Sequence, residues 1–149
     1  MKQYIGTKMI YAEPAYRHNG KIYPKTGPYP KAMDLEDGYK VRYADGYVSW
    51  SPKEVFEAAY RLTDGMSFWL AIEAAKQGKR IARAGWNGKN QYVELACCIS
   101  YVNREQLIVN VDHKNIGNKA LAFVGTSGVQ MGWLASQADM LADDWCIVE

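Results

Sequence analysis

The stretch that decides the fold is Met66–Leu95, which reads MSFWLAIEAAKQGKRIARAGWNGKNQYVEL. Apolar residues recur at helical spacing from Phe68 to Ala75, which predicts a helix with one apolar face. Ser67 is placed to accept an unpaired amide of the first turn, and Gly78 is placed where a helix end favours positive φ. The stretch therefore begins with one well-defined helix.

A short hairpin is predicted directly after this helix. Residues 80–83 alternate between polar and apolar side chains, as a half-buried strand does. Asn87-Gly88 is a strong two-residue turn signal, and residues 91–95 read as the returning strand. The predicted unit is helix, strand, tight turn and strand.

Trp86 directly precedes the predicted turn at Asn87 and Gly88, and it lies between Arg83 and Lys89 in the sequence. An aromatic face next to open backbone amides and cations suits a nucleotide, because a base can stack on the ring while phosphates find donors. An indole that only packs beneath its own hairpin fits the pattern equally well. The residues leave both interpretations open.

A first module is predicted over residues 1–64. Its expected elements are a strand at 3–13, an irregular loop from 16 to 37, a hairpin over 39–50 and a helix that begins at Ser51 with a capping box.

The second module, residues 65–149, adds strands near 106–112 and 120–124, a short helix at 136–141 and a last strand at 145–148. Ser136 and Asp139 stand in capping-box relation at the start of the short helix. The predicted fold class is therefore α+β, with small antiparallel sheets and one principal helix in each module.

Composition excludes several classes of function. The 149 residues carry a net charge of +2, which is too small for a protein that binds duplex nucleic acid. There is no apolar run long enough to span a bilayer and no signal peptide, so we expect no membrane partner and a cytoplasmic location. Cys97 and Cys98 are adjacent and match neither a disulfide framework nor metal-ligand spacing, which predicts reduced, packed thiols.

No catalytic constellation is evident. His18 and His113 lie in polar, loop-like sequence without a second ligand at metal spacing. No phosphate-binding loop or nucleophile elbow occurs, and a cluster of Asp139, Asp143 and Asp144 near a helix start is more often structural than catalytic. We therefore predict no catalytic residue, no metal site and no cofactor, and an enzyme is the less favoured interpretation.

A second candidate binding segment begins at Trp133. It places an aromatic ring ahead of the predicted short helix, where Ser136, Gln137 and Asp139 can hydrogen-bond phosphate or ribose oxygens. A tryptophan that merely anchors the short helix is an equally good interpretation.

Together these motifs make the sequence recognisable over about residues 65–149. The chain resembles the phage anti-defence family called Thoeris anti-defence 2, in Met66-Ser67-Phe68, Gly78-Lys79, Ala82-Arg83, Gly85-Trp86-Asn87-Gly88-Lys89, Trp133-Leu134-Ala135-Ser136-Gln137, Asp139-Met140-Leu141-Ala142 and Asp144-Trp145. Residues 1–62 resemble a leader module seen ahead of that domain in some phage and prophage proteins.

The resemblance implies a homotetramer that is not an enzyme and that sequesters nucleotide immune signals intact in the host bacterial cytoplasm. The implied partners are glycocyclic ADP-ribose and, in some members, the cyclic di- or trinucleotides of CBASS defence. Trp86 and Trp133 are the implied base-stacking walls, with Phe68 near them. The complete predicted ligand-binding set is Phe68, Arg83, Trp86, Asn87, Gly88, Lys89, Trp133, Ser136, Gln137 and Asp139.

Two rival functions follow from the same residues. One is an enzyme that degrades these nucleotides. The other is an inhibitor that binds a host defence effector through the tyrosine-rich N-terminal surface.

Overall fold

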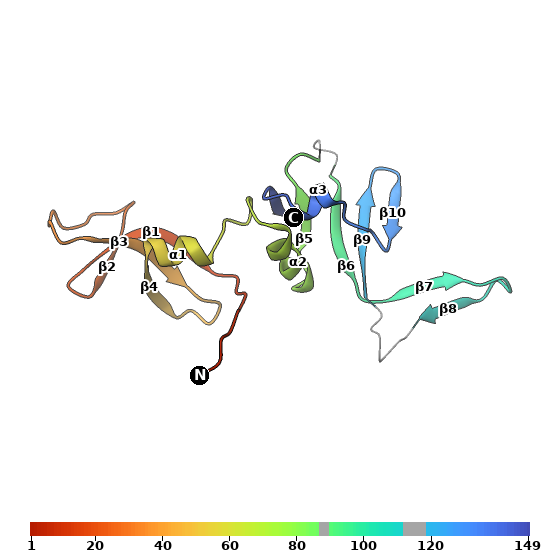
Figure 1. Ribbon diagram of the computed structural model, residues 1–149, viewed down its shortest axis with the longest axis horizontal. Coiled ribbons are helices and arrows are strands. Elements are labelled where there is room, and N and C mark those ends of the chain that lie inside the picture. Colours follow the sequence, from red (N-terminus) through yellow and green to blue (C-terminus); the bar gives the residue numbers. More distant parts are fainter. Residues whose placement is uncertain (87–89, 112–118) are drawn as a thin grey trace. The chain divides into compact units, whose positions relative to one another are not determined.

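The computed structural model describes residues 1–86, 90–111 and 119–149 (Figure 1). The chain folds as two compact units, Met1–Arg61 and Leu62–Glu149, and each is described by itself. Within the described residues no helix is long and apolar enough to cross a membrane. Both units combine antiparallel sheets with short helices, so the predicted α+β class is confirmed.

The first unit is a four-stranded antiparallel sheet in the order β2-β1-β3-β4. Its strands are β1 (Tyr11–His18), β2 (Lys21–Pro24), β3 (Glu36–Arg42) and β4 (Val48–Pro52), and helix α1 (Lys53–Ala59) follows them. The ring of Phe56 in α1 stacks on Tyr39 of β3 at 4.1 Å between centroids. This contact fixes the helix on one face of the sheet.

Two predictions for the first unit are wrong. The first strand begins at Tyr11 rather than near residue 3, and β2 lies inside the segment predicted to be a loop. Pro24 ends β2, and Pro14 lies just beyond the part of β1 that β2 pairs with, so neither proline interrupts that ladder.

The turn after β3 is confirmed, with Gly46 at φ +85° and its amide bonded to the Tyr43 carbonyl. The capping box predicted at Ser51 is wrong. Ser51 pairs with Tyr39 in the β3–β4 ladder, so the helix is capped at Pro52, without a side-chain hydrogen bond.

The second unit contains a five-stranded antiparallel sheet in the order β10-β9-β6-β5-β11. Its strands are β5 (Arg80–Arg83), β6 (Tyr92–Ala96), β9 (Ala120–Gly125), β10 (Gly128–Met131) and β11 (Trp145–Val148). Strands β7 (Ile99–Val102) and β8 (Ile108–Val111) form a separate two-stranded sheet. Helices α2 (Phe68–Lys76) and α3 (Gln137–Met140) complete the unit.

The core of the second unit lies between α2 and the five-stranded sheet. Ile81, Val93 and Phe123 are cross-strand partners on β5, β6 and β9, so their side chains share one face. Ile81 and Val93 are fully buried there, together with Ala71 of α2 and Trp145 of β11.

The helix ends of the second unit match the prediction in part. Ser67 occupies the N-cap position of α2 without a side-chain hydrogen bond, whereas Gly78 adopts φ +84° as predicted. The capping box of α3 is confirmed, because the Asp139 amide donates to Ser136 Oγ and the Ser136 amide donates to the Asp139 carboxylate.

Gly78→Ala should lower the free energy of unfolding of the second unit by about 1 kcal/mol, because an L side chain is strained at positive φ. A Cβ at Gly78 meets no atom within 4 Å, so backbone strain alone sets this cost. Urea unfolding followed by tryptophan fluorescence measures it. Gly65→Ala is the matched control, since Gly65 is equally open and lacks positive φ. An equal loss of unfolding free energy in Gly78→Ala and Gly65→Ala would contradict the explanation by backbone strain.

Candidate ligand-binding site

Trp145 is the centre of an aromatic cluster in the second unit. Its side chain is fully buried, and its indole Nε1 donates to the Asp139 carbonyl oxygen at 2.9 Å. The ring of Trp86 lies 5.4 Å from it and that of Trp133 lies 6.3 Å from it, both near perpendicular. Trp145 thereby joins the segment after β5 to the segment before α3.

The two predicted stacking residues meet within one protomer. The ring centroids of Trp86 and Trp133 are 6.1 Å apart, with an angle of 81° between the ring planes. A base held between two parallel rings needs about 7 Å between them, twice a contact distance of 3.5 Å. Trp86 and Trp133 therefore form no slot between them, and each offers only its outer, half-exposed surface to a ligand.

Phe68 lies behind this surface. It is only 8% exposed, and its ring packs against Trp145 at 5.5 Å. Its contribution is to hold the buried indole in place from the α2 side.

Arg83 is held by two carboxylates of its own chain. Its Nε donates to Asp144 at 2.9 Å, and its Nη1 donates to Asp139 at 3.2 Å. Hydrogen bonding to Arg83 lowers the pKa of the Asp144 carboxyl. Burial alone raises the pKa of Asp139, but hydrogen bonds from Ser136 and the Arg83 charge outweigh it and lower the pKa below its ordinary value. These three residues form a charged clamp between β5 and α3.

The remaining predicted site residues divide into two groups. Ser136 and Gln137 are exposed beside Trp133. The Ser136 hydroxyl donates to the Asp139 carboxylate at 2.7 Å as part of the α3 cap, so Gln137 is the more accessible polar side chain of the two. Asn87, Gly88 and Lys89 lie outside the described residues, as does His113.

The cysteines differ in their surroundings. Cys97 and Cys98 are exposed at the bend between β6 and β7, so the prediction that they are packed is wrong. Cys146 is half-buried and contacts the Ala82 carbonyl at 3.3 Å, and burial raises the pKa of its thiol, which disfavours the nucleophilic thiolate. Over residues 1–86, 90–111 and 119–149 no cluster of His, Cys, Asp and Glu could hold a metal ion.

Sequence reasoning missed the structural roles of Trp145 and Asp144. The alternation Trp145-Cys146-Ile147-Val148 predicts a strand but does not say which face is buried. The pairing of Asp144 with Arg83 joins residues 61 positions apart, which local patterns do not reveal.

Comparison with known proteins identifies the second unit. The profile of the Thoeris anti-defense 2-like domain matches residues 66–148. The chain belongs to this family. It is also 35% identical over 86 residues to a protein named Thoeris anti-defense 2 from Bacillus phage SP01, covering 56% of this chain and 94% of that protein. The resemblance expected from the two tryptophan motifs is confirmed, and membership supports an anti-defence role.

Arg83→Ala should lower the free energy of unfolding by about 1–3 kcal/mol, because two partly buried carboxylates lose a charged hydrogen-bond partner. Arg80→Ala is the matched control, since Arg80 lies on the same strand in a more exposed pair with Glu94 at 3.4 Å and should cost less than about 1 kcal/mol. Denaturant titration of both variants makes the comparison. A cost for Arg83→Ala no larger than for Arg80→Ala would contradict the clamp.

The charged clamp should also make the stability of the second unit depend on pH. The pKa values of Asp139 and Asp144 are lowered in the folded state from the ordinary 3.8. Their contribution is therefore complete above that value and is lost as the pH falls through the folded pKa values. Between neutral pH and pH 2, the free energy of unfolding should fall less for Asp144→Asn than for the wild type. Unfolding curves recorded across this range measure the difference. Identical pH profiles would mean that Asp144 does not contribute.

Proposed function

We propose that this protein sequesters cyclic nucleotide immune signals without degrading them. The observation that carries the proposal is the family match, which spans almost the entire second unit and includes both tryptophan motifs. Its candidate ligands are glycocyclic ADP-ribose and the cyclic di- and trinucleotides of CBASS defence. It acts in the cytoplasm of the infected bacterium, where these signals are made.

The surface around Trp133 supports this proposal. Trp86 and Trp133 are half-exposed large aromatic residues, and Gln137 adds an amide beside Trp133, whereas the Ser136 hydroxyl is bonded to Asp139. Aromatic faces hold a base by stacking, and neutral polar side chains hydrogen-bond ribose or phosphate oxygens. Since Arg83 is already paired with two carboxylates, neutral groups carry the polar contacts on this surface.

A sequestering protein works by affinity and number of sites rather than turnover. Its dissociation constant must lie well below the concentration at which the signal activates its effector. Nanomolar binding, about −12 kcal/mol, meets that requirement.

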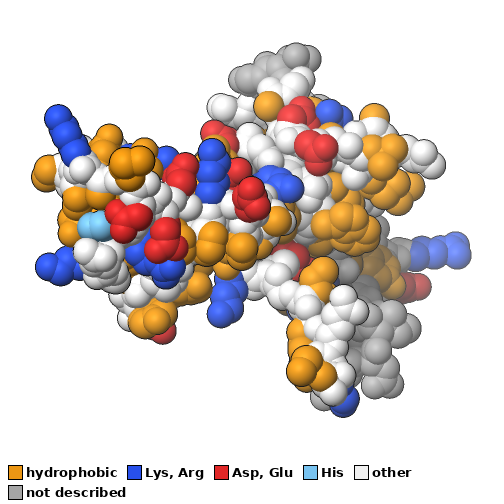
Figure 2. Space-filling view, turned by 60° about the vertical axis from the view of Figure 1, so that its left-hand side comes forward, with side chains coloured by type: hydrophobic (Ala, Val, Ile, Leu, Met, Phe, Trp, Pro, Cys, Tyr) orange, Lys and Arg blue, Asp and Glu red, His pale blue; other side chains and the backbone are white. Residues whose placement is uncertain are grey.

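We further propose that the chain acts as a homo-oligomer, expected to be a tetramer. Large apolar side chains are open to solvent beside α3, with Leu134 at 88% and Leu141 at 79% exposure. Figure 2 shows hydrophobic side chains at the surface among charged ones. Large apolar side chains that gather at a surface are typical of interaction sites.

The proposal is tested by the fate of the ligand. The purified protein is incubated with glycocyclic ADP-ribose, separated from free ligand and heat-denatured, and the released molecule is analysed by chromatography and mass spectrometry. Intact ligand in stoichiometric yield supports sequestration. A converted product would instead support a nucleotide-degrading enzyme, and capture of a host protein without nucleotide would support a protein-binding inhibitor.

Trp133→Ala and Trp86→Ala should each weaken binding of glycocyclic ADP-ribose by about 1–3 kcal/mol, because each removes a stacking surface. Calorimetric titration measures the change, and a thermal melt confirms folding, since both rings also pack on Trp145. Trp69→Ala is the control, because Trp69 lies on α2 at 75% exposure and outside the Trp145 cluster. Unchanged affinity in both test variants would place the ligand elsewhere.

A further inference from the structure

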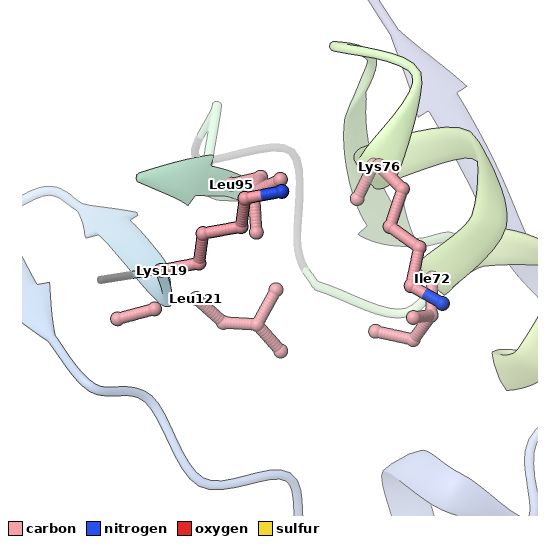
Figure 3. Close-up of a pocket in the computed structure, with 7 residues that line it drawn as sticks. Ile72, Lys76, Leu95, Lys119 and Leu121 are labelled. Carbon is pink, nitrogen blue, oxygen red and sulfur yellow. The ribbon is translucent and has the colours of Figure 1, made fainter. Parts of the chain in front are cut away.

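A pocket of about 210 Å³ opens between the C-terminal half of α2 and the ends of β6 and β9. In Figure 3, Ile72 and Lys76 of α2 stand on one side of it, and Leu95, Lys119 and Leu121 stand on the other. Ala75 and Ala120 complete the lining. Leu95 and Leu121 are direct cross-strand partners, so they form one continuous apolar wall.

The size of the pocket limits what it can hold. Pockets that enclose a whole drug-sized ligand usually measure about 300–1,000 Å³. A pocket of about 210 Å³ suits a single ring system, with the rest of the molecule outside. Apart from the two lysines, the described lining side chains are all aliphatic, so these residues hold a ring by contact and desolvation rather than by hydrogen bonds to its edge.

Two lysines lie at the mouth of the pocket. Among the lining residues that the structure describes, Lys76 and Lys119 are the charged ones, one from each side. Lys76 Nζ pairs with Glu73 at 2.6 Å and is 58% exposed, so a stronger anion can displace that surface pair at little cost. Two ammonium groups beside an aliphatic wall fit a flat ring that carries anionic groups, as the base and phosphates of a nucleotide do.

The strand that lines the pocket also contacts the segment that carries Trp133. The Trp133 amide donates to the Leu121 carbonyl at 2.8 Å, so the segment before α3 runs beside the strand that lines the pocket. Leu121 and Phe123 are two residues apart on β9 and therefore share a face, and the Phe123 ring packs on Trp133 at 6.4 Å. A ligand in the pocket therefore lies against the same strand that supports Trp133.

We propose that this pocket takes one ring of the nucleotide and that Lys76 and Lys119 hold the phosphates at its mouth. The inference rests on the proposed function for the class of ligand, but it adds a site that the tryptophan motifs do not include. Because the described residues of the wall offer no uncharged polar side chain to the edge of the ring, we expect them to distinguish adenine from guanine only weakly. Recognition depends mainly on the anionic groups.

The test uses the full-length protein and glycocyclic ADP-ribose as the probe. The double variant Lys76→Ala/Lys119→Ala should weaken binding about tenfold or more and reduce its dependence on salt concentration. Ile72→Trp fills the pocket and should weaken binding by a similar factor at any salt concentration. Lys79→Ala is the matched control, since Lys79 is exposed just beyond α2 and does not line the pocket.

The outcomes separate this inference from the proposed function. Wild-type affinity in both pocket variants overturns the pocket assignment and leaves sequestration intact. Failure of the wild-type protein to bind glycocyclic ADP-ribose removes the proposed ligand and the inference with it. A thermal melt identifies a variant that has failed to fold, and the lysine variant then decides, because Lys76 and Lys119 are both exposed and do not support the core.

Discussion

The buried indole of Trp145 is the contact on which the second unit depends. Its ring packs against Phe68 of α2, Trp86 after β5 and Trp133 before α3, and its Nε1 bonds to the backbone of α3. Contacts from α2, from the segment after β5 and from the segment that leads into α3 therefore converge on one buried side chain. A rigid surface loses little conformational entropy on binding, and this is what a protein that acts by affinity alone requires.

Charge in the second unit is divided between structure and binding. Arg83 is enclosed by Asp139 and Asp144 and stabilises the junction between β5 and α3, although its position beside Trp86 suggests a phosphate ligand. The accessible cations at the pocket lie instead on α2 and before β9, at Lys76 and Lys119. A positive residue next to an aromatic one in sequence is therefore a poor guide to which charge remains available.

Local signals predicted much of the fold. Helical spacing located α2, positive φ was correctly assigned to Gly78, and the Ser136–Asp139 capping box located α3. The failures occurred where tertiary pairing outweighed a local motif, as when the β3–β4 ladder recruited Ser51. For the proposed site, the sequence pointed to both tryptophans but not to their edge-to-face packing, and it did not indicate a pocket whose lining comes from three separate segments between Ile72 and Leu121.

Calorimetric titration of the full-length protein against a panel of cyclic nucleotides tests the central claim most directly. The account predicts saturable binding of at least one member, with a fixed ratio of ligand to protein and a nanomolar dissociation constant. The titrations are repeated at several temperatures, because a binding enthalpy near zero at one temperature differs from zero at another. The account is contradicted if neither glycocyclic ADP-ribose nor any cyclic di- or trinucleotide gives binding heat at any of them.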